Sequence, residues 1–228
     1  MPASAPILTR DTFAFLRDLT GNNSKEWMDA NRQRYQETVV APFRALLEAL
    51  APAALQLQPD FDVSGRTGPN FSRINRDIRF ARDKTPYRPQ MYLMFPDHKL
   101  KDGGQLYVGV MPEEATIGFR IYGMKRESLL ARITRPRALQ NLKWVARQKQ
   151  RLGRKYESYW YSTEKGEWTR HKGWPLAAEE WQKLKGWIVR KQLKPSAVAG
   201  SRFPADAVKA FRELYPLFAF TSRIAWRK

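Results

Sequence analysis

Hydrophobic residues recur at helical spacing through the first sixty residues of the chain. Thr9 or Asp11 can cap a short first helix, because both side chains can accept a hydrogen bond from a free backbone N–H. A second helix has apolar positions that run from Trp27 to Leu50 at close to every fourth residue. This pattern predicts a group of N-terminal helices over residues 9–58.

The middle of the chain changes to short apolar runs separated by turn residues. Pairs such as Gly103-Gly104 are typical of tight connections. Consecutive strands with short links favour an antiparallel meander. We therefore expect a central sheet of about four strands within residues 70–123, with the strands at 71–81, 90–95, 105–111 and 116–122.

The last hundred residues return to helical spacing. Helices are expected over 126–134, where Pro136 should end the helix, and over 138–152, 176–193 and 206–215. Residues 156–174 are aromatic and show no clear period. The chain is thus predicted to be a single α+β domain over residues 1–228, in which the helices of the basic part, residues 125–228, pack on the sheet.

Composition supports a folded core and excludes several classes of protein. Hydrophobic residues make up 43% of the chain, with 8 Trp, 9 Tyr and 12 Phe, so overall disorder is not expected. The absence of cysteine excludes disulfides, zinc–thiolate sites and cysteine nucleophiles, and indicates a cytoplasmic protein. No uninterrupted apolar run approaches the roughly 20 residues of a membrane span, and the N-terminus lacks signal-peptide features. A membrane partner is therefore not expected.

The net charge of +19 is concentrated in two segments. Residues 65–101 hold nine basic and three acidic side chains, and residues 125–195 hold 19 basic and six acidic ones. Such positive fields attract nucleic acid, anionic small molecules or acidic protein partners. A merely solubilising surface is the alternative for the second segment.

The segment Phe71–Tyr87 combines four arginines, two aspartates and one lysine. Read as a strand, it places Arg73, Asp77 and Arg79 on one polar face, where Asp77 can hold the two arginines by bidentate hydrogen bonds. Spare guanidinium N–H groups would then bind a carboxylate or phosphate. The alternative is an Arg–Asp ladder that only joins the strand to its neighbours.

The anion-site hypothesis draws on further residues around this segment. Asn31 could add a neutral donor, although helix capping is the alternative for it. Lys84 follows the strand in a rigid turn. The candidate ligand-binding residues are Arg73, Arg76, Asp77, Arg79, Asp83, Lys84, Tyr87, Asn31 and Lys172.

At this point the chain resembles a known family. The run from Arg73 to Tyr87 fits the pattern Arg-Ile-x-Arg-Asp-x-Arg-Phe-x-x-Asp-Lys-x-Pro-Tyr of a conserved hypothetical family of unknown function from bacteria and fungi. The segments Asn22–Trp27 and Asn31–Tyr35 are similar to its N-terminal entry, and Lys172 stands near its C-terminal Lys-Arg-x-Pro segment. After Tyr87 the chain departs from the pattern, with Arg88-Pro89-Gln90 in place of a Lys-x-His-like continuation. The resemblance implies a whole-chain frame and no established reaction.

Most catalytic and cofactor motifs are missing. The two histidines, His98 and His171, have no partners at metal-ligand spacing, so no metal is expected. There is no dinucleotide fingerprint, no phosphate-binding loop and no nucleophile elbow, so no cofactor is predicted. No complete catalytic constellation appears.

Two functions remain open, with a third less constrained. Residues 140–195 interleave cations with rings, as nucleic-acid-binding surfaces do, although the same rings could fill a core. A nucleic-acid or phosphate-binding protein is the first prediction, and an enzyme acting on a small phosphorylated or carboxylated substrate is the alternative. An interaction module for an acidic protein is the third possibility. The rings next to cations are found in Lys143-Trp144, Arg154-Lys155-Tyr156, Trp168-Thr169-Arg170 and Lys185-Gly186-Trp187.

Overall fold

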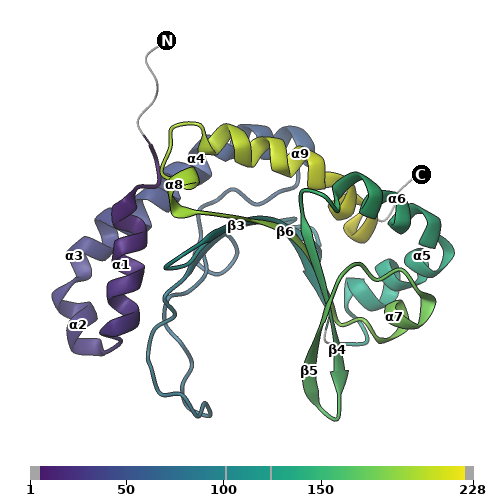
Figure 1. Ribbon diagram of the computed structural model, residues 1–228, viewed down its shortest axis with the longest axis horizontal. Coiled ribbons are helices and arrows are strands. Elements are labelled where there is room, and N and C mark those ends of the chain that lie inside the picture. Colours follow the sequence, from purple (N-terminus) through teal and green to yellow (C-terminus); the bar gives the residue numbers. More distant parts are fainter. Residues whose placement is uncertain (1–5, 101, 124, 224–228) are drawn as a thin grey trace. The chain divides into compact units, whose positions relative to one another are not determined.

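The computed structural model describes residues 6–100, 102–123 and 125–223 (Figure 1). Residues 1–5, the start of the segment that lacks signal-peptide features, lie outside the described part. The elements in chain order are α1 (Arg10–Gly21), α2 (Lys25–Ala30), α3 (Arg32–Tyr35), the π-helical turn η1 (Gln36–Val40), α4 (Ala41–Leu57), β1 (Met91–Pro96), β2 (Gln105–Val110), β3 (Ala115–Tyr122), the π-helical turn η2 (Leu130–Thr134), α5 (Arg135–Gln140), α6 (Leu142–Leu152), β4 (Glu157–Glu164), β5 (Glu167–Lys172), α7 (Ala178–Lys183), β6 (Gly186–Leu193), α8 (Pro195–Val198) and α9 (Phe203–Ser222).

The chain is a mixed α and β protein with an antiparallel sheet of six strands rather than about four. The strand order is β1-β2-β3-β6-β4-β5. Three of these strands, β4, β5 and β6, lie in the C-terminal part that was expected to be helical or irregular. Their aromatic and β-branched side chains, such as Tyr159, Trp160 and Val189, suit a pleated surface better than a helix.

Two compact units divide the chain. The first comprises residues 1–95, 108–116 and 192–209, and the second comprises 96–107, 117–191 and 210–228. Strands of the sheet fall in both units.

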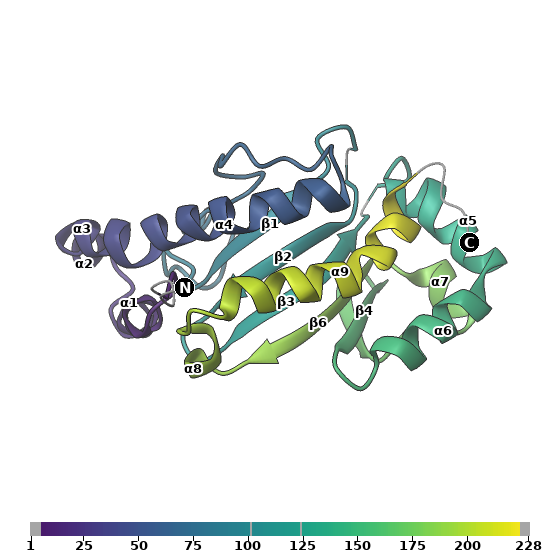
Figure 2. The same ribbon diagram turned by 90° about the horizontal axis from the view of Figure 1, so that it is seen from above.

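The helices of the first unit follow the predicted pattern closely. Thr9 caps α1, and its hydroxyl oxygen accepts a hydrogen bond from the backbone N–H of Asp11. The ring of Phe15 on α1 lies 5.5 Å from that of Trp27 and 5.6 Å from that of Tyr35, measured between centroids. The start of the apolar stripe therefore packs on α1, and its later members on α4, such as Phe43 and Leu50, are also buried. Figure 2 shows that α4 extends well beyond α1.

The helical run Arg32–Leu57 is long and apolar enough, by length and composition, to cross a membrane, and it is the one such helix in the described ranges. This criterion is looser than an uninterrupted apolar run, because Arg44 and Glu48 fall within it. A core helix passes the same test, and Phe43 and Leu50 of this helix are buried. One such helix is weak evidence for a membrane span.

Pro136 does not end a helix as expected, and it stands in the same kind of position as Pro42. Pro42 and Pro136 each stand in the first turn of a helix that continues from a π-helical turn. Before Pro136, the backbone N–H of Arg135 bonds five residues back, to the carbonyl of Leu130. The wider turn makes room for the proline ring, which would clash with a carbonyl in a regular helix. Helical structure therefore continues past Pro136 to the end of α5.

The expected helix over 176–193 is half helix and half strand. Helix α7 ends at Lys183, and β6 begins at Gly186. A Cβ atom on Gly186 would lie 2.5 Å from the ring of Tyr122, so only glycine allows the strand to pass this ring. Helical periodicity in the sequence does not report this tertiary contact.

Tryptophans fill the core of the second unit. Trp187 on β6 contacts the rings of Phe119, Trp174 and Trp181, with centroids 5.4 to 5.8 Å apart. Trp144 on α6 stacks on Phe220 at 4.1 Å. Aromatic pairs at these distances contribute beyond their buried area. Trp187, Trp181 and Phe119 are fully buried.

Residues 71–81 do not form the expected strand. The segment makes only isolated bridges, in which Phe71 pairs with Thr67 and Leu93, and Asn75 pairs with Tyr87. Ile74 is 7% exposed whereas Phe80, on the same predicted face, is 95% exposed, so the period-2 pattern fails beyond Asn75. Several of its charged side chains pair within the loop, Arg76 with Asp83 and Arg79 with Asp77.

Candidate anion site

The loop from residue 72 to 90 is closed at its base by backbone hydrogen bonds. The N–H of Arg76 donates to the carbonyl of Pro86 at 2.8 Å, and the N–H of Arg88 donates to that of Ile74 at 2.7 Å. Asn23, from the N-terminal helical region, fastens the same point. Its side chain donates to the carbonyl of Tyr87 at 2.9 Å and accepts from the N–H of Tyr87 at 3.0 Å. Tyr87 thus anchors the loop.

Arg79 and Asp77 form a bidentate pair within the loop. The Nε and Nη2 atoms of Arg79 donate to the two carboxylate oxygens of Asp77 at 2.9 and 2.7 Å. These hydrogen bonds lower the pKa of Asp77 below its ordinary value. The pair is exposed, and the arginine fork that was expected to face a ligand is directed at a neighbouring carboxylate.

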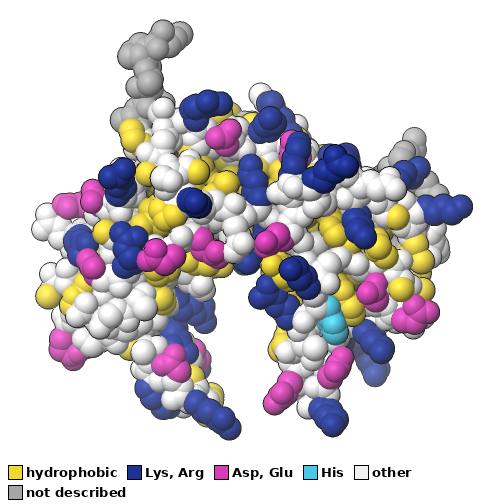
Figure 3. Space-filling view, viewed as in Figure 1, with side chains coloured by type: hydrophobic (Ala, Val, Ile, Leu, Met, Phe, Trp, Pro, Cys, Tyr) yellow, Lys and Arg dark blue, Asp and Glu magenta, His cyan; other side chains and the backbone are white. Residues whose placement is uncertain are grey.

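Arg76, Asp83 and Lys84 also have partners inside the loop. Arg76 donates to the carboxylate of Asp83 and to the hydroxyl of Thr85. The backbone N–H of Thr85, together with Arg76, lowers the pKa of Asp83 to about 2. The ammonium group of Lys84 donates to the carbonyl of Ile78 at 3.0 Å. Figure 3 accordingly shows both basic and acidic side chains on this loop.

Arg73 differs from the other arginines of the loop. It lines a pocket of about 240 Å³ in the first unit, together with Arg44 of α4. Neither arginine makes a hydrogen bond or an ion pair with the residues that the structure describes. The pocket is lined by Tyr35, Val40, Arg44, Thr67, Phe71, Ser72, Arg73, Ile74, Asn75 and Met91.

The pocket lining combines two arginines and three polar side chains with apolar and aromatic ones, and it has no acidic side chain among the described residues. Thr67 and Asn75 add a hydroxyl and an amide to the two guanidinium groups. Burial raises the pKa of Tyr35, so its phenol stays protonated at neutral pH. The arrangement can donate hydrogen bonds from several directions, and it offers two fixed positive charges.

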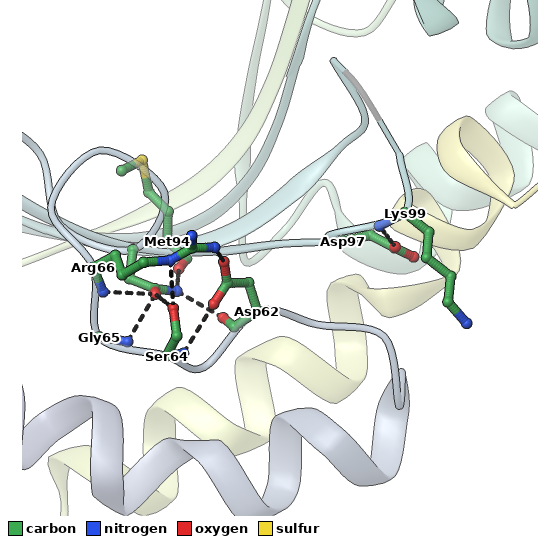
Figure 4. A network of polar contacts seen from close by, with 8 residues as sticks. Asp62, Ser64, Gly65, Arg66, Met94, Asp97 and Lys99 are labelled. Carbon is green, nitrogen blue, oxygen red and sulfur yellow. Dashed lines mark hydrogen bonds and ion pairs between the residues drawn. The ribbon is translucent and has the colours of Figure 1, made fainter.

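A network around the buried Asn70 holds the loop that forms one wall of the pocket. The amide oxygen of Asn70 accepts from the backbone N–H groups of Gly65 and Arg66 at 3.0 and 3.2 Å. Its amide nitrogen donates to the carbonyls of Asp62 and Met94 at 2.6 and 3.1 Å. Figure 4 shows Asp62, Ser64, Gly65 and Arg66 turned toward one another in this network. Thr67 and Ser72 are held on either side of it.

A family model described as "Conserved hypothetical protein (DUF2461)" matches residues 11–220 of the chain. The chain belongs to this family. The match includes all residues of the pocket and of the loop. A search of curated proteins finds no significant match. The family description carries no activity, so function has to be argued from the site.

The sequence did not identify Arg44 as a candidate ligand-binding residue. It lies on the exposed side of α4, next to the buried Phe43, where an arginine is ordinary in a solvated helix face. Val40 lies one turn before Arg44 and lines the same pocket. Only the return of the loop to the helix distinguishes Arg44 from other surface arginines.

Of the nine predicted site residues, only Arg73 lines the pocket, six others lie in the loop beside it, and Asn31 and Lys172 lie outside both. The amide of Asn31 donates to the carbonyl of Trp27 at 2.9 Å, which is the capping alternative considered for it. Lys172, at the end of β5, belongs to the second unit and lines a different pocket of about 420 Å³, with Lys149 and Arg154. Neither takes part in the site of the first unit.

A serine–histidine pair occurs in the hairpin of β4 and β5. The Oγ of Ser162 lies 2.8 Å from Nε2 of His171 and 3.4 Å from a carboxylate oxygen of Glu164. Ser162 is only 2% exposed, so a substrate cannot reach its hydroxyl. In the described ranges, no group of three or more His, Asp or Glu side chains could hold a metal ion. These side chains stabilise the hairpin.

Proposed function

We propose that the pocket of Arg44 and Arg73 binds the phosphate group of a small anionic ligand. The observation that carries this proposal is the contrast within one loop. Among the residues that the structure describes, Arg76 and Arg79 have carboxylate partners, whereas Arg73 has none and lines a pocket with a second arginine that has none. Both arginines line the same pocket, so an anion bound in it would be attracted by two positive charges.

The chemistry of the lining suits phosphate. Each guanidinium presents a rigid fork of N–H donors that matches two phosphate oxygens. Thr67 and Asn75 supply neutral donors for the remaining oxygens. A pocket of about 240 Å³ accommodates an inorganic phosphate, a pyrophosphate or the phosphorylated end of a larger molecule.

Binding is favoured over catalysis by the side chains of the lining. Among its described residues there is no carboxylate or imidazole that could act as a general acid or base near neutral pH. The tyrosine phenol is held protonated by burial. We therefore place a binding function ahead of an enzymatic one.

Isothermal titration calorimetry with pyrophosphate tests the proposal. Arg73→Gln and Arg44→Gln should each weaken binding by about 10- to 150-fold, because each removes a charge-assisted hydrogen bond. Arg79→Gln removes the same charge from the same loop, from a side chain that is paired with Asp77. Its affinity should stay within about twofold of the unmodified protein.

The Arg79→Gln variant distinguishes a specific binding site from a general attraction of pyrophosphate to positive charge. Equal losses in all three variants would show that pyrophosphate responds only to the net charge of the first unit. No measurable heat with the unmodified protein at low salt would rule out the proposed site.

A further inference from the structure

The outer face of β4, β5 and β6 collects aromatic and basic side chains in the second unit. Register places Tyr161 opposite Arg170 and Gly186, and residues directly opposite one another share a face. The other face holds Trp160 and Trp187, which are buried. Figure 1 shows α5, α6 and α7 on one side of β4 and β5, so within this unit the outer face has no helix over it.

Three rings of this outer face form an exposed cluster. Centroids of Tyr122 and Tyr161 lie 6.2 Å apart, those of Tyr122 and Trp168 6.2 Å, and those of Tyr161 and Trp168 5.8 Å. Trp168 is 44% exposed and Tyr122 is 38% exposed. Large rings at this exposure leave apolar surface in contact with water, and a cluster of such rings is typical of a binding surface.

Cations frame the rings on the same face. The guanidinium of Arg170 lies 3.8 Å from the centroid of Tyr159, and that of Arg190 lies 5.4 Å from it on the neighbouring strand. Lys172 stands opposite Tyr159 in the register. Arg170 and Lys172 are exposed and form no ion pair with the described residues. The carboxylate of Glu157, at the end of this face, accepts a hydrogen bond from the hydroxyl of Tyr159.

The structure separates these rings from the other ring and cation pairs of residues 140–195. Trp144, Tyr156 and Trp187 are buried and fill the core. Trp168 and Arg170 are exposed on one face of a hairpin, two positions apart on β5. The alternation of strand side chains therefore produces this surface from residues 156–174, a segment in which the sequence showed no clear period.

We propose that this face binds single-stranded nucleic acid, with unpaired bases stacked on Trp168 and Tyr122 and phosphates held by Arg170 and Lys172. Exposed rings accept the flat faces of unpaired bases, and cations beside them neutralise the backbone. A duplex keeps its bases stacked on each other, so it cannot use the rings. An acidic protein would use the cations and leave the rings without a specific role.

Fluorescence anisotropy with a labelled oligo(U) strand, and with a duplex of equal length, tests this inference on the full chain. Binding of the single strand should weaken steeply from low to moderate salt, because phosphate contacts release counterions. Trp168→Leu should weaken it by about 5- to 150-fold, since one stacking surface is lost, while Trp168→Phe keeps most of the affinity.

Charge variants complete the test and do not depend on the stability of the tryptophan variants. Arg170→Gln should reduce the slope of log affinity against log salt by about one, as expected for one lost phosphate contact. Arg147→Gln removes the same charge from an exposed position on α6 and should change the slope little. These variants leave Arg44 and Arg73 untouched, so pyrophosphate binding should be unchanged.

Three outcomes would overturn the inference. They are equal binding of single strand and duplex, equal effects of Arg147→Gln and Arg170→Gln, and no binding of oligo(U) at low salt. In the last case an acidic protein becomes the better partner for this face.

Discussion

Arg73 and Arg79 show how much the immediate partner decides what an arginine can do. Both lie in one loop and both carry a full charge at any physiological pH. The guanidinium group of Arg79 donates two hydrogen bonds to the carboxylate of Asp77, at 2.7 and 2.9 Å. Arg73 instead lines a pocket with Arg44. The density of arginine in the sequence pointed to the loop, and only the pairing within it separates the structural arginines from the candidate ligand-binding one.

Asp83 provides a test of these pairings at the residue scale. Its pKa of about 2 lies below the ordinary value. The hydrogen bond from the backbone N–H of Thr85 is the larger cause, and the hydrogen bond from Arg76 is the next. Since the folded-state pKa is depressed, the stabilisation is present above the unfolded pKa of 3.8 and is lost as pH falls toward about 2. NMR titration should show the Asp83 carboxylate protonating well below its ordinary pKa of 3.8.

The same titration in an Arg76→Gln variant separates the two contributions. The pKa of Asp83 should rise and still stay below its ordinary value, because the hydrogen bonds from Thr85 remain. An unchanged pKa would mean that the ion pair between Arg76 and Asp83 does not form in solution.

At the scale of elements, backbone conformations explain where sequence patterns succeeded and failed. Helix α1 follows its apolar spacing and its Thr9 cap, so it could be predicted. The hairpin of β4 and β5 was missed although its turn carries a signal. Lys165 and Gly166 have φ of 50° and 84°, which suits the tight turn of a two-residue hairpin. The aromatic run around that turn hid it, because nearly every position is large.

Substitutions in this turn should shift the stability of the hairpin in opposite directions. Gly166→Ala should lower the free energy of unfolding by about 1–2 kcal/mol, because a Cβ is disfavoured at positive φ. Lys165→Asn should raise it by up to about 1 kcal/mol, because asparagine adopts this conformation more readily than lysine. Urea denaturation measures both. Equal effects of the same sign would contradict the assigned turn.

The Asn70 loop offers a second test at this scale. Asn70→Ala removes two buried hydrogen bonds from its amide and should lower the free energy of unfolding by about 3 kcal/mol or more. Because the loop also carries Thr67 and Ser72, pyrophosphate affinity should fall as well. Ser64→Ala, at the edge of the network, is the control and should cost less than about 1 kcal/mol. Similar losses in both variants would argue against a central role for Asn70.

At the scale of the whole molecule, the sequence predicted the class of fold and one half of the candidate site. The N-terminal helices and β1 to β3 followed from periodicity, and charge singled out the segment of Arg73, although as a strand and not as the loop that it forms. The three C-terminal strands and Arg44 did not, because they depend on contacts between residues far apart in the chain. In β6, for example, Gly186 lies against the ring of Tyr122 from β3. Arg44 of α4 lines a pocket with Arg73, which is 29 residues further along the chain.

Tertiary pairing in the second unit predicts a pH dependence of stability. Burial and a 2.7 Å hydrogen bond to Glu213 raise the pKa of Tyr156 above its ordinary value. Burial of Glu213 opposes its ionisation, and hydrogen bonds from Tyr156 and Lys155 outweigh this and lower its pKa. The contribution of Tyr156 to stability is therefore complete below the pKa of tyrosine in the unfolded chain. It is lost as the pH rises through the higher pKa of Tyr156 in the folded protein. The glutamate contribution is present above its unfolded pKa of 4.5 and is lost at acid pH.

The variant Tyr156→Phe measures how much the hydrogen bond between Tyr156 and Glu213 stabilises the fold. It should lower the free energy of unfolding by about 1.5–3 kcal/mol at neutral pH, since a hydrogen bond to a carboxylate is lost. The difference from the unmodified protein should shrink below about pH 4, where Glu213 becomes protonated in the unfolded chain. A difference that is independent of pH would show that packing alone accounts for the effect.

The central claim is that Arg44 and Arg73 hold an anion, and a crystal structure of the protein grown with inorganic phosphate tests it most directly. The account predicts phosphate density within hydrogen-bond distance of both guanidinium groups, while Arg79 stays paired with Asp77. Phosphate bound instead at Arg76, Arg79 or Lys84, or a pocket in which Arg44 and Arg73 have turned away to protein carboxylates, would contradict it.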